Sequence, residues 1–189
     1  LCDGCARFRL LCKRCLIFAV VNRGVHKETG EAVAIKAIEK GRTDVSAIRR
    51  EVAILQKVGS HPNIVALRDV FETADTWYLV MELVTGGELF ERLVKQGPYS
   101  EKEASRLMRQ MAEAIAWLHS QGVCHRDLKP ENLLLVDGSD DAAVKVCDFG
   151  LSAFCGAGRP PLSAAVGTVA YMAPEVVRRA EYGAAVDLW

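Results

Sequence analysis

The stretch His125–Asn132 reads HRDLKPEN, and the rest of the chain is best interpreted outward from it. It contains an acid at Asp127, a lysine at Lys129 and an asparagine at Asn132. The carboxylate can accept the proton of a hydroxyl nucleophile, the ammonium group can hold a phosphoryl oxygen, and the amide can bind a metal ion. Phosphoryl transfer depends on such positioning and charge stabilisation more than on covalent chemistry. The stretch therefore indicates phosphoryl-transfer chemistry.

Three further motifs accompany this stretch in a fixed order. VAIK at residues 33–36 precedes it, DFG at residues 148–150 follows it, and APE at residues 173–175 comes last. The four motifs in this order are those of protein kinases. From about Val20 to Trp189, the chain therefore resembles a eukaryotic protein kinase catalytic domain of the serine/threonine type.

Longer segments narrow the resemblance to one kinase group. MELVTGGELFERL, DLKPENLLL, DFGLSAF and GTVAYMAPEV begin at residues 81, 127, 148 and 167. They are similar to the calcium/calmodulin-dependent kinases, including the calcium-dependent kinases of plants and protists. The resemblance implies control by calcium or calmodulin through segments that lie outside this chain.

The resemblance also implies an α+β, bilobal protein kinase-like fold that is incomplete at both ends. Residues 20–84 would form a small lobe around an antiparallel sheet, and residues 85–189 would form part of a helical lobe. Hydropathy periodicity predicts strands at 20–23, 31–38, 64–71, 77–83, 133–136 and 144–147, and helices at 44–58, 88–96 and 100–122. Because the chain stops at Trp189, where a core helix would begin, we expect this piece to be poorly soluble or inactive alone.

ATP and Mg²⁺ are the cofactors that the resemblance implies. Lys36 would contact the α- and β-phosphates and form an ion pair with Glu51, for which a surface salt bridge is the alternative. Asp148 would bind the Mg²⁺ ion that bridges the phosphates, and Asn132 would bind a second ion. The other nucleotide contacts would come from Val21, Ala34, Met81, Glu82, Val84, Glu88 and Leu134. For Glu88, contact with ribose or a basic substrate and a simple role as a first-turn helix acid are equally open.

The same resemblance assigns the groups that act on a protein substrate. Asp127 would orient and deprotonate a serine or threonine hydroxyl, and Lys129 would neutralise charge on the transferring phosphoryl group. Thr168 would bond both of these residues, and Glu131 would meet a basic residue of the substrate. Asp187 resembles the aspartate that holds the backbone of the catalytic loop in kinases.

Activation is expected to depend on a phosphate. Arg126 precedes the catalytic acid, and in kinases such an arginine is often neutralised by a phosphate on the activation loop. Residues 151–166 contain no Asp or Glu. We therefore predict that Arg126 has no built-in acidic partner and that phosphorylated Ser163 supplies one.

Residues 1–19 depart from the kinase pattern. They contain two CxxC pairs, Cys2 with Cys5 and Cys12 with Cys15, at a spacing that is short for one zinc ion. A disordered or wrongly joined segment and a zinc-binding segment both stay open. No glycine occurs from Arg14 to Val21, where kinases carry the glycine-rich loop that covers the ATP phosphates.

Composition excludes some partners. Lys plus Arg and Asp plus Glu each number 24, so no net field favours nucleic acid. No apolar run is long enough for a membrane span, and seven cysteines without a secretory signal favour a reducing compartment. The sequence thus predicts a cytoplasmic protein, with the nucleus also open, that acts on proteins. The alternatives are a pseudokinase or scaffold, or a kinase remnant with a zinc-binding segment.

Overall fold

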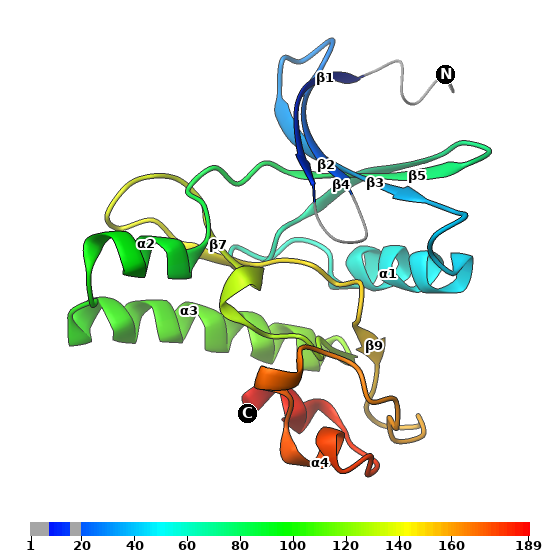
Figure 1. Ribbon diagram of the computed structural model, residues 1–189, viewed down its shortest axis with the longest axis vertical. Helices are drawn as coiled ribbons and strands as arrows, with labels where there is room; N and C mark the ends of the chain where they lie inside the picture. Colours follow the sequence, from blue (N-terminus) through cyan, green and yellow to red (C-terminus); the bar gives the residue numbers. More distant parts are fainter. Residues whose placement is uncertain (1–7, 16–19) are drawn as a thin grey trace. The chain divides into compact units, whose positions relative to one another are not determined.

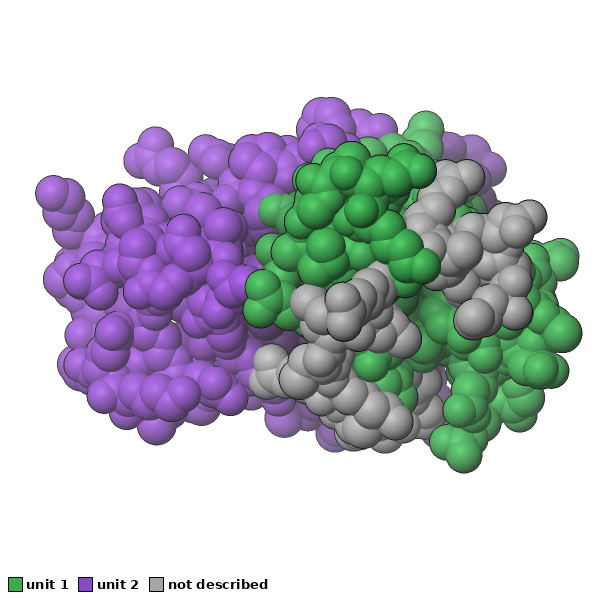
Figure 2. Space-filling model, turned by 90° about the horizontal axis from the view of Figure 1, so that it is seen from above, with its two compact units in different colours: residues 1–59, 66–83 green, residues 60–65, 84–189 purple. Residues whose placement is uncertain are grey.

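The computed structural model describes residues 8–15 and 20–189 (Figure 1). These residues divide into two units (Figure 2). Unit 1 comprises the described residues up to Gly59 together with Ala66–Leu83, and unit 2 comprises Ser60–Val65 and Val84–Trp189. The division after Leu83 lies next to the expected one, but residues 60–65 were expected in the first lobe.

Backbone pairing explains why residues 60–65 belong to unit 2. Val146 donates its N–H to the carbonyl of Asn63 at 2.9 Å and accepts the N–H of Val65 at 3.0 Å. The Asn63 side chain also donates to the carbonyl of Val144 at 2.8 Å. The segment was expected to begin a strand at residue 64, and these bonds instead attach it to the strand around Val144.

Unit 1 contains a five-stranded sheet in the order β1-β2-β3-β5-β4, and all neighbouring strands are antiparallel. The strands are β1 Phe8–Cys15, β2 Val20–His26, β3 Ala32–Glu39, β4 Leu67–Glu72 and β5 Thr76–Glu82. Alternation along β3 buries Val33 and Ile35, which form a cluster with Val80 of β5. Alternating burial of this kind is what the two-residue period of the sequence predicts.

Strand β1 corrects part of the expectation for residues 1–19. Residues 8–15 are not disordered, because they pair with β2, with Phe8 opposite His26 and Cys15 opposite Val20. The Phe8 ring lies 5.0 Å from the His26 ring and 5.8 Å from the Phe71 ring, measured between centroids. These aromatic contacts stabilise an edge strand that hydropathy did not reveal. Cys2 and Cys5 lie outside the described residues, so the zinc hypothesis stays a prediction.

Helix α1, Val45–Val58, completes unit 1. Asp44 caps its first turn by accepting the N–H of Ser46 at 3.0 Å, and Gly59 ends the helix with a φ of 66°. The buried side chains recur at helical spacing and are Ile48, Glu51, Val52, Ile54, Leu55 and Val58. Glu51 is the charged member of this buried face.

Unit 2 is built on two helices, α2 Leu89–Gln96 and α3 Glu101–Ser120. A capping box begins α3, since Ser100 and Glu103 exchange side-chain and backbone bonds. Leu107, on α3, packs with Leu135 and Val144 in one buried cluster. This cluster fixes the two short strands β7 Leu133–Leu135 and β8 Val144–Val146 against the helix.

Short elements hold the motifs of unit 2. Strand β6 Val123–Cys124 pairs with β9 Ala153–Phe154, and β7 pairs with β8. The stretch His125–Asn132, called the catalytic stretch below, therefore lies between β6 and β7, and the DFG motif lies between β8 and β9. The remaining elements are η2 Pro130–Asn132, η3 Val169–Tyr171, α4 Pro174–Val177 and η4 Ala184–Leu188. Among the described residues, no helix has the length and apolar character needed to cross a membrane.

Candidate active site

In unit 1, Lys36 of β3 and Glu51 of α1 form a close ion pair. The Lys36 Nζ lies 2.7 Å from the Glu51 Oε1, and the two residues are 8% and 5% exposed. The alternative of a surface salt bridge is wrong, because both charged groups are withdrawn from water. A buried charge that loses its partner is costly, so each residue fixes the position of the other.

In unit 2, the carboxylate of Asp127 is held by Thr168, Lys129 and Asn132. Its Oδ1 accepts the backbone N–H and the hydroxyl of Thr168, both at 2.8 Å. Its Oδ2 lies 3.0 Å from the Nζ of Lys129, which also donates to the Thr168 hydroxyl at 2.8 Å. The side chains of Asp127, Lys129 and Thr168 form a closed triangle, although Thr168 lies 41 residues from Asp127 in sequence. The contacts expected for Thr168 are therefore present.

Gly167 allows this approach of Thr168 to the stretch His125–Asn132. It has a φ of 117°, and a Cβ placed on it would lie 2.6 Å from the carbonyl oxygen of Arg126. Such a distance is far below van der Waals contact, and the dihedral angle is one that side chains rarely adopt. Glycine at position 167 thus permits the Thr168–Asp127 bonds.

Asn132 and Asp148 are the residues proposed to bind metal. Asn132 is buried and donates its amide N–H groups to the carbonyl oxygen of Asp127 at 2.8 Å and to its Oδ2 at 3.3 Å. These bonds use only the amide nitrogen, so the amide oxygen could still contact the proposed metal ion. Asp148 has a φ of 61°, a left-handed conformation that aspartate tolerates better than most residues.

The donor set fits Mg²⁺ better than a closed protein cage. No group of three or more His, Cys, Asp or Glu side chains in the described part of the chain could hold a metal ion. Mg²⁺ prefers oxygen ligands and commonly takes one or two from the protein, with water and substrate phosphates supplying the rest. One carboxylate and one amide oxygen match that requirement.

Asp187 holds the backbone of the catalytic stretch. Its Oδ2 accepts the N–H of His125 and its Oδ1 accepts the N–H of Arg126, each at 2.8 Å. The role that the resemblance implies for Asp187 thus has a direct structural basis. His119, near the end of α3, adds a contact of 2.9 Å to the Asp187 Oδ2. Sequence reasoning missed His119, because the partners are 68 residues apart.

His125 is fully buried, and its ring contacts Asp127, Cys147 and Phe149. Its Nδ1 accepts the N–H of Asp127 at 3.3 Å, and its Nε2 lies 3.2 Å from the carbonyl oxygen of Cys147. The His125 ring meets the Phe149 ring at a centroid distance of 5.1 Å. Burial lowers the pKa of His125, because the charged imidazolium would lose its hydration. The neutral ring therefore links Asp127 to the segment before the DFG motif.

Arg126 has neutral partners. Its Nε donates to the carbonyl oxygen of Leu151 at 2.7 Å, and its Nη1 donates to the Tyr182 hydroxyl at 3.1 Å. No ion pair joins its guanidinium group to a carboxylate within the described residues. Ser163 is exposed in the segment that follows Leu151. Tyr182 was not anticipated from the sequence.

The nucleotide residues expected in unit 1 are neighbours in its sheet. Val21 of β2 is opposite Lys36 of β3, and Ala34 of β3 is opposite Met81 of β5. Glu82 ends β5, and its backbone N–H donates to the carbonyl oxygen of Ala66 at 2.9 Å. The sheet therefore brings these positions together by strand register.

The expected residues of unit 2 lie on separate elements. Val84 is followed by α2, for which Glu88 is the N-cap residue, and an isolated bridge joins Glu88 to Leu134. The Glu88 side chain makes no capping bond, so the structure leaves both of its proposed roles open. Glu131 is exposed on η2. Exposure suits the proposed contact of Glu131 with a substrate.

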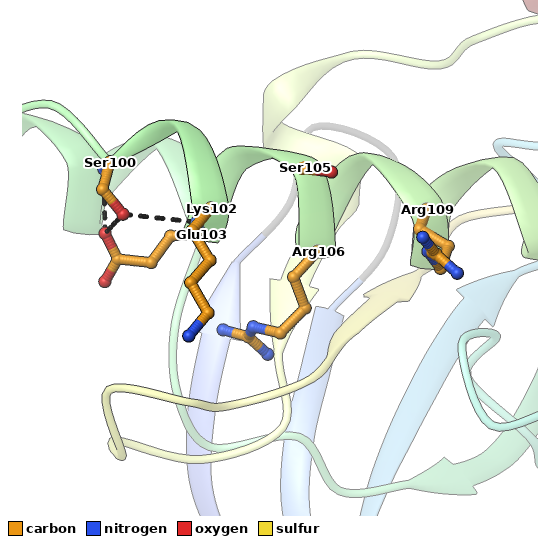
Figure 3. Close-up of a pocket in the computed structure, with 6 residues that line it drawn as sticks. All are labelled: Ser100, Lys102, Glu103, Ser105, Arg106 and Arg109. Carbon is orange, nitrogen blue, oxygen red and sulfur yellow. Dashed lines mark hydrogen bonds between the residues drawn. The ribbon is translucent and has the colours of Figure 1, made fainter.

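One hollow of unit 2 lies beside helix α3. It has a volume of about 670 Å³ and occupies one side of α3 (Figure 3). Its lining residues are Ser100, Lys102, Glu103, Ser105, Arg106 and Arg109. The Glu103 carboxylate is already bonded to Ser100, as the dashed lines show. None of the expected site residues lines this hollow, and its shape and charges fit a solvated helix face.

Comparison with known proteins identifies the family. The model of the protein kinase domain matches residues 17–189, which begins slightly before the expected start near Val20. A probable serine/threonine-protein kinase, pXi, from Dictyostelium discoideum is 48% identical over 91% of this chain and 25% of its own length. A probable myosin light chain kinase from the same organism is 46% identical over 91% of this chain and 44% of its own.

A second organism contributes a similar relative. Calcium/calmodulin-dependent protein kinase type 1 of Macrobrachium nipponense is 46% identical over 87% of this chain and 48% of its own length. The chain thus spans about a quarter to a half of the length of these three relatives. From the matched domain and these identities, the chain belongs to the protein kinase domain family, among kinases of the serine/threonine type.

Proposed function

We propose that the protein transfers the γ-phosphoryl group of ATP to serine and threonine hydroxyls of protein substrates. The observation that carries this proposal is the closed triangle of Asp127, Lys129 and Thr168, with Asn132 bonded beside it. The triangle combines a proton acceptor with a cation at one place. Such an arrangement suits the transfer of a negatively charged group to a hydroxyl.

The proposed reaction assigns one step to each group. The substrate hydroxyl loses its proton to Asp127, and its oxygen forms a bond to the γ-phosphorus. The bond from that phosphorus to the β,γ-bridging oxygen breaks, and ADP leaves. Lys129 offsets the negative charge of the transferring group, and Thr168 keeps the Asp127 carboxylate oriented. Positioning and charge stabilisation would therefore supply most of the rate enhancement.

Nucleotide binding is proposed for the residues to which the resemblance assigns it. Lys36, held by Glu51, would contact the ATP phosphates, and Asp148 and Asn132 would hold Mg²⁺. When bound, Mg²⁺ neutralises charge on the phosphates. Val21, Ala34, Met81, Glu82, Val84, Glu88 and Leu134 would contact adenine or ribose. Because residues 14–21 contain no glycine, we expect phosphate cover to be the weakest part of this site.

Regulation is proposed through Ser163 and through segments outside this chain. A phosphate on Ser163 would give Arg126 the charged partner that its neutral contacts do not provide. In the full-length protein, Ser163→Ala should lower specific activity, and unchanged activity would contradict this role. Calcium or calmodulin control is proposed from the resemblance. Cys124 and Cys155 form no disulfide, which supports the proposed cytoplasmic or nuclear location.

The test is transfer of radiolabelled γ-phosphate from ATP to serine- and threonine-containing peptides by the full-length protein with Mg²⁺. Peptides with and without basic residues near the acceptor would test Glu131. The glycine-free segment favours one competing function, a pseudokinase or scaffold. Binding of Mg-ATP in a thermal-shift assay without any transfer would establish that competing function and reject ours.

A further inference from the structure

We propose that Tyr182 is a positioning residue that connects Arg126 to the activation segment, defined as residues 151–166, while Ser163 carries no phosphate. The inference rests on the proposed kinase function and goes beyond it. The Tyr182 hydroxyl accepts the Nη1–H of Arg126 at 3.1 Å and donates to the carbonyl oxygen of Ala164 at 2.5 Å. One hydroxyl thus bonds the residue before Asp127 and the residue after Ser163.

The backbone of Tyr182 holds the other side of Ser163. Its carbonyl oxygen accepts the N–H of Leu162 at 2.9 Å, and its N–H donates to the carbonyl oxygen of Leu162 at 2.8 Å. Leu162 and Ala164, which flank Ser163, are therefore both bonded to Tyr182. The Ser163 side chain stays exposed between these two attachments. Its backbone is held while its hydroxyl remains open to modification.

The Tyr182 ring cannot easily move its hydroxyl. Tyr182 is 6% exposed and lies in a buried cluster with Ala173 and Val176 of the APE region. Leu162, Met172 and Val186 cover the remainder of this cluster. Because such close-packed side chains keep one rotamer, the hydroxyl is held in place by the ring. The contact with Arg126 is therefore a fixed feature of this arrangement.

The acceptors of Arg126 carry no charge, which explains why its bond to Tyr182 would matter before Ser163 is phosphorylated. Arg126 donates to a carbonyl oxygen and to the Tyr182 hydroxyl, which are both neutral acceptors. A phosphate carries nearly two negative charges and attracts the Arg126 cation more strongly than a neutral oxygen acceptor does. A phosphate on Ser163 would therefore compete with Tyr182 for Arg126. Tyr182 should matter most in the unphosphorylated protein and little after phosphorylation.

The first test measures kinetics in the full-length protein after phosphatase treatment. Tyr182→Phe keeps the buried ring and removes only the hydroxyl. The substitution removes two hydrogen bonds, one from Arg126 and one to Ala164. Loss of even one hydrogen bond changes an equilibrium by about fivefold, so kcat should fall at least about fivefold while the KM for ATP stays within about twofold. With Ser163 phosphorylated, the same substitution should lower kcat by less than about twofold. Equal losses in both forms would indicate a merely structural role and overturn the proposal.

The second test does not depend on activity. Hydrogen exchange of peptides from residues 156–166 should be several-fold faster in Tyr182→Phe than in the parent protein, because the Ala164 attachment is lost. Tyr78→Phe serves as the matched control, since Tyr78 lies in the apolar cluster of the unit 1 sheet. Unchanged exchange in Tyr182→Phe would overturn the proposal. An inactive parent protein with faster exchange in Tyr182→Phe would instead reject the proposed kinase function alone.

Discussion

The buried ion pair of unit 1 permits a quantitative prediction. Lys36 and Glu51 approach to 2.7 Å with side chains that are 11% and 7% exposed. We consider the replacements Lys36→Met and Glu51→Leu, singly and together. Each single replacement leaves one charge buried without this partner, whereas the double replacement removes both charges and keeps apolar bulk. The single variants should therefore lose more stability than the double variant.

The magnitude follows from distance and burial. At an effective dielectric constant of about 20, two charges 2.7 Å apart attract each other by about 6 kcal/mol before desolvation is counted. Breaking a buried pair by removing one partner typically costs about 3–5 kcal/mol. We therefore expect each single variant to lose about 3 kcal/mol of unfolding free energy. The double variant should lose less than the sum of the two by at least about 2 kcal/mol.

The assay is urea unfolding of the full-length protein and its variants. Their unfolding free energies are compared where the dependence on urea concentration has the same slope. A matched control is the pair of Lys40 and Glu72, which approach to 2.6 Å with side chains that are 22% and 43% exposed. The coupling free energy of this exposed pair is the difference between the loss in the double variant and the summed losses of Lys40→Met and Glu72→Leu. It should stay below about 1 kcal/mol. Additive losses at Lys36 and Glu51, or equal coupling in the two pairs, would refute the reasoning from burial.

Three further substitutions test unit 2. Asp127→Asn should lower kcat about 10²- to 10⁴-fold in peptide phosphorylation, since the amide cannot accept the hydroxyl proton. Gly167→Ala should lose about 1–3 kcal/mol of unfolding free energy, because its Cβ would lie 2.6 Å from the Arg126 carbonyl oxygen at a φ of 117°. His125→Phe should flatten the pH dependence of stability. Burial lowers the pKa of His125, so the folded state resists protonation, and stability should fall as pH drops below about 6.5.

Each of these predictions has its own contrary outcome. Activity within tenfold of the parent would exclude Asp127 as the proton acceptor. Gly138→Ala is the control for Gly167→Ala, because a Cβ at Gly138 meets nothing within 4 Å, and equal losses at the two sites would refute the steric argument. For His125, an unchanged loss of stability between about pH 6.5 and pH 5 in the Phe variant would assign that loss to other groups, such as His61, whose pKa burial also lowers.

The family and the α+β kinase-like fold expected from the motifs are confirmed by the matched domain. Helix α1, helix α3 and their caps at Asp44 and Ser100 were predictable, because capping and helical periodicity depend on residues within a few positions of each other. The Lys36–Glu51 and Thr168–Asp127 contacts were expected only from the resemblance to kinases. Nothing local in either segment indicates its partner.

Other features could not be expected from local patterns. Strand β1 escaped prediction because an edge strand depends on backbone bonds to β2 and on the contacts of Phe8 with His26 and Phe71. Residues 60–65 belong to unit 2 because they form bonds to Val146, more than 80 residues later. Such pairings follow from long-range register, which hydropathy does not encode.

By itself, the sequence determined the chemical equipment: an acid, a lysine and an asparagine within His125–Asn132, with the order of the surrounding motifs. Tertiary structure alone decided how Arg126 is held, by Tyr182 and without a carboxylate among the described residues. The physical reason is separation along the chain. Residue types and spacings within one loop can be read locally, whereas Arg126 and Tyr182 are 56 residues apart and meet only because the chain folds back.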